Sequence, residues 1–148
     1  MIAKSNKLKN KNKIKVYIAS PLCVKEDRDF AEKLDSLCKE LGLETFLPHR
    51  DCGLWKEGVS FEKIAKGDIE GFKNCKLLVA NLNGFNIGAG TAWEMGYAHA
   101  RGIPIIAIKT DRKLKDSVEE VSAIIMGLTK IVSSFEDLKR EVERVLKV

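Results

Sequence analysis

Five short apolar runs recur along this chain, and each is followed by a stretch whose apolar residues repeat at helical spacing. Nearly continuous apolar runs are typical of strands that are buried on both faces of a parallel sheet. The predicted strands cover residues 14–19, 43–47, 76–82, 104–108 and 129–132. The predicted helices cover residues 26–41, 60–72, 91–101, 117–126 and 134–146, and residues 48–59 are expected to form a loop. The pattern therefore predicts an α/β fold.

This alternation predicts a single flavodoxin-like, doubly wound domain over residues 14–148. Its five-stranded parallel sheet should have the order 2-1-3-4-5, with helices on both faces. Ligands of such folds bind beyond the carboxyl ends of the strands, where the winding reverses. In this chain that point lies between the first and third predicted strands, which directs attention to residues 17–22 and 81–90.

The positive charge of the chain is concentrated at its N-terminus. Six lysines and no acid occur in residues 1–15, so this segment alone carries more positive charge than the formal net charge of +5 of the whole chain. Residues 1–13 lack apolar periodicity, which predicts a disordered basic tail. Contact of this tail with nucleic acid is one interpretation, and a solvated extension is the simpler one.

Cysteine spacing and apolar run lengths bear on the compartment. The four cysteines are scattered without a C-x-x-C pair, which indicates free thiols and no metal site. No apolar run is long enough to span a membrane, and no secretory leader is recognisable. We therefore expect a cytoplasmic protein without membrane contact.

A polar, glycine-containing segment precedes the third predicted helix, at the switch point of the fold. Gly88 and Gly90 allow close backbone approach to a ligand, and they leave N–H groups at a helix N-terminus, which suits an anion or an oxygen atom. Glu94 lies one turn into this helix, where a carboxylate is a candidate nucleophile or base. The alternative is a capping box, in which the Glu94 carboxylate binds the N–H of Thr91.

Two other side chains are candidates for the same crevice. Asp68, near the end of the second predicted helix, lies either at the rim of the crevice or on a solvated helix face. Tyr17, near the carboxyl end of the first strand, is either a core tyrosine or a phenol that orients the Glu94 carboxylate. The segment that begins with Ser20 is neither the acidic pair of a phosphoacceptor receiver domain nor the Ser/Thr/Gly-rich phosphate loop of a flavodoxin, so both are disfavoured.

Four segments follow one another in a distinctive order: VYIASPL at residues 16–22, LPHRD at 47–51, DIE followed by LLVANL within 68–82, and GTAWEMGYA at 90–98. Together they resemble the nucleoside 2-deoxyribosyltransferase family, which includes the related 2′-deoxynucleoside 5′-monophosphate N-hydrolases. The resemblance implies the doubly wound fold and cleavage of the N-glycosidic bond between a sugar and a nucleobase. It also implies a role for each candidate: Glu94 is the nucleophile, Tyr17 positions it, and Asp68 handles the proton of the departing base.

One position departs from the transferases of this family. Six residues before the nucleophile they commonly place an aspartate that binds the 5′-hydroxyl of the sugar, whereas this chain has Gly88, with Asn86 as the nearest polar side chain. The N-hydrolases carry a small neutral residue there, which would not repel a phosphate. Residues 122–127 also resemble the hydrolases, in which the serine matching Ser122 reaches the phosphate from a neighbouring subunit, although residues 90–94 are more like the transferases. Further candidate phosphate contacts are Ser20, His49 and Arg50.

The expected function is cleavage of the N-glycosidic bond of (deoxy)nucleosides through a glycosyl-enzyme intermediate on Glu94, with transfer of the sugar to another base. The alternative is hydrolysis of 2′-deoxynucleoside 5′-monophosphates to free base and sugar phosphate. A non-catalytic nucleotide-binding module is the alternative of another class. Two carboxyl groups suffice for this chemistry, so no metal or organic cofactor is expected. The resemblance further implies a homodimer or larger homo-oligomer with shared active sites.

Overall fold

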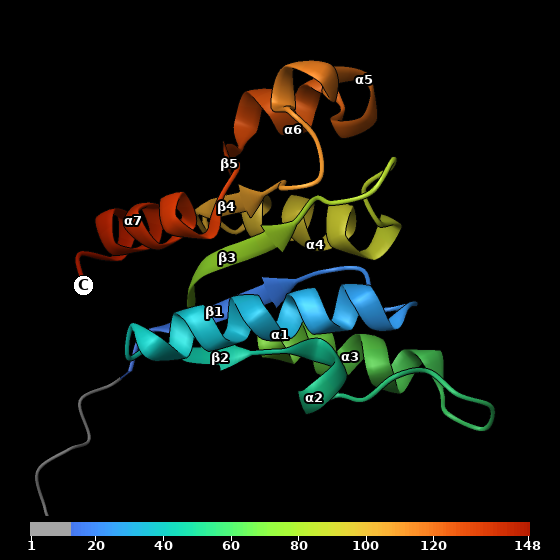
Figure 1. Cartoon of the computed structure of the whole chain (residues 1–148). Helices are drawn as coiled ribbons and strands as arrows, with labels where there is room; N and C mark the ends of the chain where they lie inside the picture. Colours follow the sequence, from blue (N-terminus) through green and yellow to red (C-terminus); the bar gives the residue numbers. More distant parts are fainter. Residues whose placement is uncertain (1–12) are drawn as a thin grey trace, which may run out of the picture.

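The computed structural model describes residues 13–148, and within them five parallel strands form one sheet in the order β2-β1-β3-β4-β5. The predicted doubly wound α/β fold and its strand order are thus confirmed (Figure 1). Residues 1–12 of the predicted basic tail lie outside the described residues. The strands are β1 (Lys15–Ala19), β2 (Glu44–Phe46), β3 (Cys75–Asn81), β4 (Ile105–Ile108) and β5 (Lys130–Val132). The helices are α1 (Lys25–Glu40), α2 (Pro48–Asp51), α3 (Phe61–Gly71), α4 (Ala89–Ala100), α5 (Val118–Val121), α6 (Ala123–Leu128) and α7 (Phe135–Leu146), with the 3-10 turn η1 (Leu114–Asp116).

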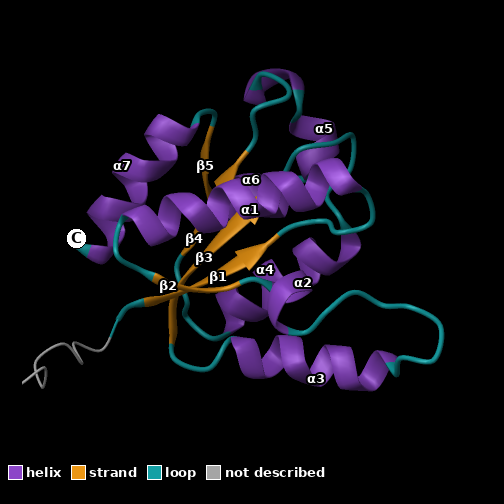
Figure 2. Cartoon of the chain, turned by 60° about the horizontal axis from the view of Figure 1, so that its bottom comes forward, coloured by secondary structure: helices purple, strands orange, loops and turns teal. Residues whose placement is uncertain are grey.

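Each face of the sheet has its own core. Helices α1 and α7 lie over one face of the sheet, and α3 and α4 lie over the other (Figure 2). The core on the second face also contains Phe72, just after the end of α3, and Val121 of α5. Because successive strand residues point to opposite faces, Val16 and Ile18 of β1 contact the α1 side, whereas Tyr17 and Ala19 contact the α3–α4 side. This alternation directs the phenol of Tyr17 toward α4. None of the helices in residues 13–148 is long and apolar enough to cross a membrane.

Two predicted elements were wrong. The single helix expected over residues 117–126 is two short helices, because Ser122 has a φ of 75° and ends α5 before α6 begins. Most residues other than glycine avoid a positive φ, so the apolar spacing of residues 117–126 did not predict that the helix would break at Ser122. The loop expected over residues 48–59 begins instead with helix α2, in which Pro48 occupies the first turn.

Candidate active site

Tyr17 and Glu94 meet at the centre of the α3–α4 face. The Tyr17 hydroxyl donates a hydrogen bond of 2.8 Å to Glu94 Oε1, across 77 positions of sequence. Tyr17 is fully buried, and Glu94 is partly buried on the inner side of α4. Helix α4 begins at Ala89, with Gly88 as its N-cap and no side-chain cap bond, so Thr91 lies inside the helix rather than at its start. The structure therefore directs the Glu94 carboxyl to a phenol on β1 and not to a capping box.

The surroundings of Glu94 oppose its ionisation. Burial raises the pKa of Glu94 to about 7, the hydrogen bond from Tyr17 lowers it, and the nearby charge of Asp68 raises it again. Burial and the same two carboxyls also raise the pKa of the Tyr17 phenol far above its ordinary value, so the phenol stays a donor. A carboxyl whose pKa is raised toward neutrality gives a more basic carboxylate than a solvated glutamate does, which makes it the stronger nucleophile once it is ionised.

Asp68 of α3 lies close enough to both Tyr17 and Glu94 to raise the pKa of each. It is half-buried, and its Oδ1 atom is buried without a hydrogen-bond partner among the described residues. Burial raises the pKa of the Asp68 carboxyl, and the neighbouring Cys52 thiol lowers it. With one oxygen unpartnered, this carboxyl can exchange a proton with a ligand.

Cys52 is a neighbour of Asp68 that the sequence did not single out. Burial and Asp68 together raise the pKa of its thiol to about 11, so it stays protonated. Its sulfur lies 2.6 Å from the ideal position of a β-carbon on Gly67, which is too close for any side chain at that position. Gly67 therefore lets the chain after α2 close directly onto α3, beside Asp68. The only signal in the sequence is that Cys52 follows the LPHRD segment.

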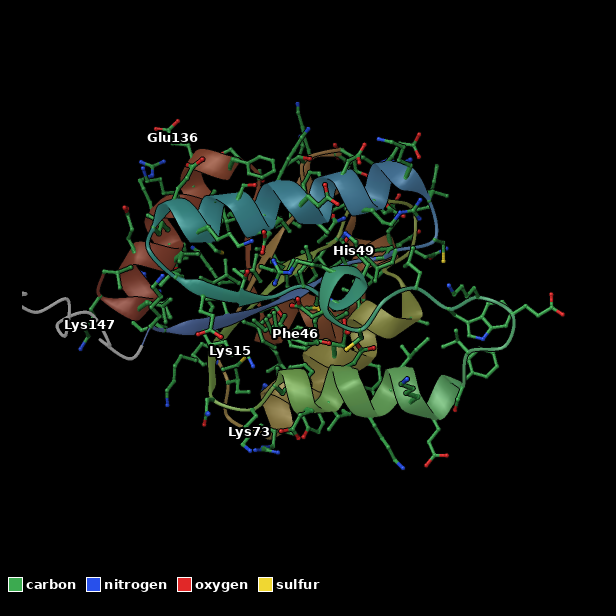
Figure 3. All side chains as sticks on the ribbon, turned by 90° about the horizontal axis from the view of Figure 1, so that it is seen from below. Lys15, Phe46, His49, Lys73, Glu136 and Lys147 are labelled. Atoms are coloured by element: carbon green, nitrogen blue, oxygen red, sulfur yellow. The ribbon has the colours of Figure 1, made fainter. Side chains whose placement is uncertain are left out.

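An aromatic wall supports the phenol. The ring of Tyr17 stacks on Phe72 with centroids 3.9 Å apart, and the centroid of the tilted Phe46 ring lies 5.0 Å from that of Tyr17. Phe46 in turn packs on Gly71, where an added β-carbon would lie 2.5 Å from the ring. Figure 3 labels Phe46 between the sheet and α3. Stacked rings leave Tyr17 little rotational freedom, which fixes the direction of its hydroxyl.

Ser20 and Asn81 join the ends of β1 and β3 at the switch point. Asn81 Nδ2 donates to Ser20 Oγ at 3.0 Å, and Asn81 Oδ1 accepts the N–H of Asn83 at 2.9 Å. Ser20 also donates to the carbonyl of Pro21 at 3.1 Å. Both side chains are buried, so they brace the two loops. Sequence reasoning included Asn81 only as the first residue of the segment 81–90 and gave it no role.

The N-terminus of α4, the helix that carries Glu94, is a candidate site for an anion or an oxygen atom. Thr91 is 2% exposed, and its Oγ1 has no hydrogen-bond partner among the described residues. A β-carbon at Gly88 would lie 3.4 Å from that oxygen and 3.0 Å from Pro21 Cγ. The glycine therefore leaves room that a side chain would fill. Gly90 and Asn86 are exposed in the same segment.

The remaining sequence candidates form no hydrogen bond to Tyr17, Asp68 or Glu94 among residues 13–148. Arg50 is held by Asp35 and Asp51 at 3.0 Å and 2.7 Å, and it donates to the carbonyl of Thr45, so it fastens α2 to α1 and β2. His49, labelled on α2 in Figure 3, is 3.1 Å from Glu32 of α1. Ser122 is exposed between α5 and α6. No group of three or more His, Cys, Asp and Glu side chains in residues 13–148 is arranged to hold a metal ion.

Comparison with known proteins places these features in context. A family model described as nucleoside 2-deoxyribosyltransferase matches residues 16–137. A conserved protein from Enterococcus faecalis V583 is 29% identical, with a TM-score of 0.73 over 89% of this chain and 98% of the other. A 2-deoxyribosyltransferase from Bacillus psychrosaccharolyticus is 23% identical, with a TM-score of 0.65 over 84% and 90% of the two chains. A CMP N-glycosidase from Clostridium botulinum is 21% identical, with a TM-score of 0.61 over 90% and 99%. No protein of curated function matches in sequence.

Proposed function

The chain belongs to the nucleoside 2-deoxyribosyltransferase family, whose members act on N-glycosidic bonds, and we propose that it cleaves (deoxy)nucleosides and transfers the sugar to a second base. The observation that carries this proposal is the 2.8 Å hydrogen bond between the buried Tyr17 hydroxyl and Glu94, with Asp68 close enough to raise the pKa of Glu94. This arrangement offers one carboxyl for attack and a second for proton transfer.

In the first step, an oxygen of the Glu94 carboxylate attacks C1′ of the nucleoside as the N-glycosidic bond breaks. The bonding electrons leave with the base, whose ring nitrogen takes the proton of Asp68. The product is an ester between the sugar and Glu94, and Asp68 is left ionised. The sugar carries positive charge in the transition state, which the carboxylate stabilises at close range.

In the second step, a ring nitrogen of the acceptor base attacks C1′ and gives its proton to Asp68. The ester bond breaks, and its electrons return to Glu94 as a carboxylate. Two displacements on opposite faces give net retention at C1′. Tyr17 donates to Glu94 Oε1 throughout, so it orients the other carboxyl oxygen and disperses the charge that develops on release.

A second candidate function is hydrolysis of 2′-deoxynucleoside 5′-monophosphates. Three features favour it: Gly88 stands at the N-cap of α4, the first N–H groups of that helix lack a side-chain cap, and Thr91 Oγ1 is buried without a partner among the described residues. A 5′-phosphate at this N-terminus would meet N–H donors and no carboxylate. By its resemblance to the hydrolases, the exposed Ser122 would reach the phosphate from a neighbouring subunit.

One assay separates these functions. The protein is incubated with a deoxynucleoside or its 5′-monophosphate, with and without a second base, and the products are resolved by chromatography. Exchanged base that depends on the acceptor supports transfer, whereas free base from the monophosphate alone supports hydrolysis. Saturable binding without turnover would identify a nucleotide-binding module and would overturn both proposals. The Glu94→Gln variant, which keeps the shape of the side chain, is the matched control and should be inactive.

A further inference from the structure

A buried lysine lies just behind the loop that joins β3 to α4. Lys109 follows the last residue of β4 and is 1% exposed. Its Nζ donates to the carbonyls of Leu82 and Gly84, each at 3.0 Å, and lies 3.0 Å from Asp111 Oδ1. An ammonium has three N–H donors, so all of them are used within the protein. Lys109 therefore has no donor left for a substrate.

The loop is fastened to the residues after β4 by further bonds of the same kind. Asp111 Oδ2 accepts the N–H of Gly84 at 2.8 Å. Asn83 and Thr110 form a reciprocal pair, in which Asn83 Nδ2 donates to Thr110 Oγ1 at 3.0 Å and Thr110 N donates to Asn83 Oδ1 at 2.8 Å. Gly84 has a φ of 107°, which only glycine adopts readily, so the loop turns sharply where it is held.

The charges of this cluster balance within it. Lys109 faces Asp111 and, at 3.9 Å, Glu120 of α5. Glu120 also pairs with Arg112, whose guanidinium lies 3.8 Å from the centre of the exposed Phe85 ring. The cluster thus connects three segments, which are the β3–α4 loop, the chain after β4, and α5. Lys109 follows β4, which flanks β3 on the side opposite to β1, the strand that carries Tyr17.

We propose that Lys109 is a positioning residue, which holds the β3–α4 loop in the conformation that receives the sugar end of the substrate. This inference rests on the proposed function, because the loop leads directly to Gly88 and to the helix that carries Glu94. Without the ammonium, two loop carbonyls lose their donor and the loop opens. Substrate then binds only to molecules in which the loop is closed, so the apparent affinity for substrate falls in proportion to the fraction of closed molecules. Once substrate is bound, the loop is closed and the chemical step is unchanged.

The test compares Lys109→Met with the wild type in steady-state kinetics on a deoxynucleoside. We expect KM to rise by about tenfold or more, with kcat within about threefold of the wild type. Lys109→Arg keeps the charge and the donors, so its KM should stay closer to that of the wild type. The matched control is Lys76→Met, which removes an exposed lysine of β3 and should change neither constant. A folded Lys109→Met protein with wild-type KM, or with a loss confined to kcat, would overturn the proposal.

Hydrogen exchange supplies a readout that does not require turnover. In Lys109→Met, amides of residues 82–90 should exchange faster than in the wild type while those of β1 keep their rate. If Lys109→Met does not fold, Lys109→Gln keeps a polar group at this position but loses the charge and one of the three N–H donors, and it should give the same changes with smaller size. Unchanged exchange in residues 82–90 of the folded variant would refute the role of Lys109. Absence of nucleoside cleavage by the wild type would refute the proposed function instead, and the exchange experiment would still decide whether Lys109 holds the loop.

Discussion

Replacing Glu94 by glutamine should make this protein more stable above neutral pH. The fold raises the pKa of Glu94 from its ordinary value of 4.5 to about 7, mainly through burial. The folded chain therefore holds this proton more tightly than the unfolded chain does. Between pH 4.5 and 7 the unfolded state releases the proton first, so the free energy of unfolding of the wild type falls across this window.

The size of the effect follows from the same shift. A rise of the pKa from 4.5 to about 7 corresponds to about 3 kcal/mol at pH values above both. Glutamine cannot ionise, and its carbonyl oxygen can still accept the hydrogen bond from Tyr17. We therefore expect Glu94→Gln to exceed the wild type by about 2–3 kcal/mol at pH 8, and the advantage to disappear near pH 4.

Urea unfolding followed by circular dichroism from pH 4 to pH 8 measures this difference. The control is Glu136→Gln, which alters an exposed carboxyl on α7 (Figure 3) and should show no such pH dependence. The reasoning would be refuted by a Glu94→Gln advantage that is absent at pH 8 or that is the same at pH 4 and pH 8. Such a result would mean that the Glu94 carboxyl is well solvated, and the case for an activated nucleophile would fail with it.

Three other substitutions test the surroundings of Glu94. Tyr17→Phe removes a hydrogen bond that lowers the pKa of Glu94, so the acidic limb of the pH profile of kcat/KM should move to higher pH, and kcat should fall by about tenfold. An acidic limb at the wild-type pH would show that the Tyr17 hydroxyl does not act on the Glu94 carboxyl. Asp68→Asn should lower kcat by about a hundredfold for natural nucleosides, and by much less for a nucleoside whose leaving group needs no proton; equal losses would exclude Asp68 as the acid. Gly71→Ala places a β-carbon 2.5 Å from the Phe46 ring and should reduce the free energy of unfolding by about 1–3 kcal/mol in thermal denaturation, whereas an unchanged Tm would show that the ring can move.

The strand order and the meeting of Tyr17 with Glu94 were within reach of the sequence for a physical reason. Apolar runs that alternate with amphipathic helices leave few sheet topologies, and the doubly wound order brings β1 beside β3. The two-residue period of a strand then places Tyr17 on the face opposite Val16. The tyrosine and the glutamate were named from residue chemistry and a family resemblance, and their catalytic roles remain predictions.

Other features depend on contacts that no local pattern encodes. The break at Ser122 needs a left-handed serine, which the apolar spacing of residues 117–126 does not reveal. Arg50 was a candidate phosphate ligand, but Asp35, fifteen positions earlier, holds its guanidinium. In the sequence, Lys109 is an ordinary lysine that follows a predicted strand. Its partners in the β3–α4 loop become apparent only when β3 and β4 are placed side by side. These residues act through partners that only the folded chain brings together.

The central claim is that the Glu94 carboxylate forms a bond to C1′ of the sugar. Its most direct test is mass spectrometry of the protein after acid quench of a reaction with a deoxynucleoside in the absence of an acceptor base. We expect a fraction of the protein to be heavier by one deoxyribosyl group, with the added mass on the peptide that contains Glu94 and absent from Glu94→Gln. Turnover of the same deoxynucleoside by Glu94→Gln at the wild-type rate, or the added mass on a different peptide, would contradict it.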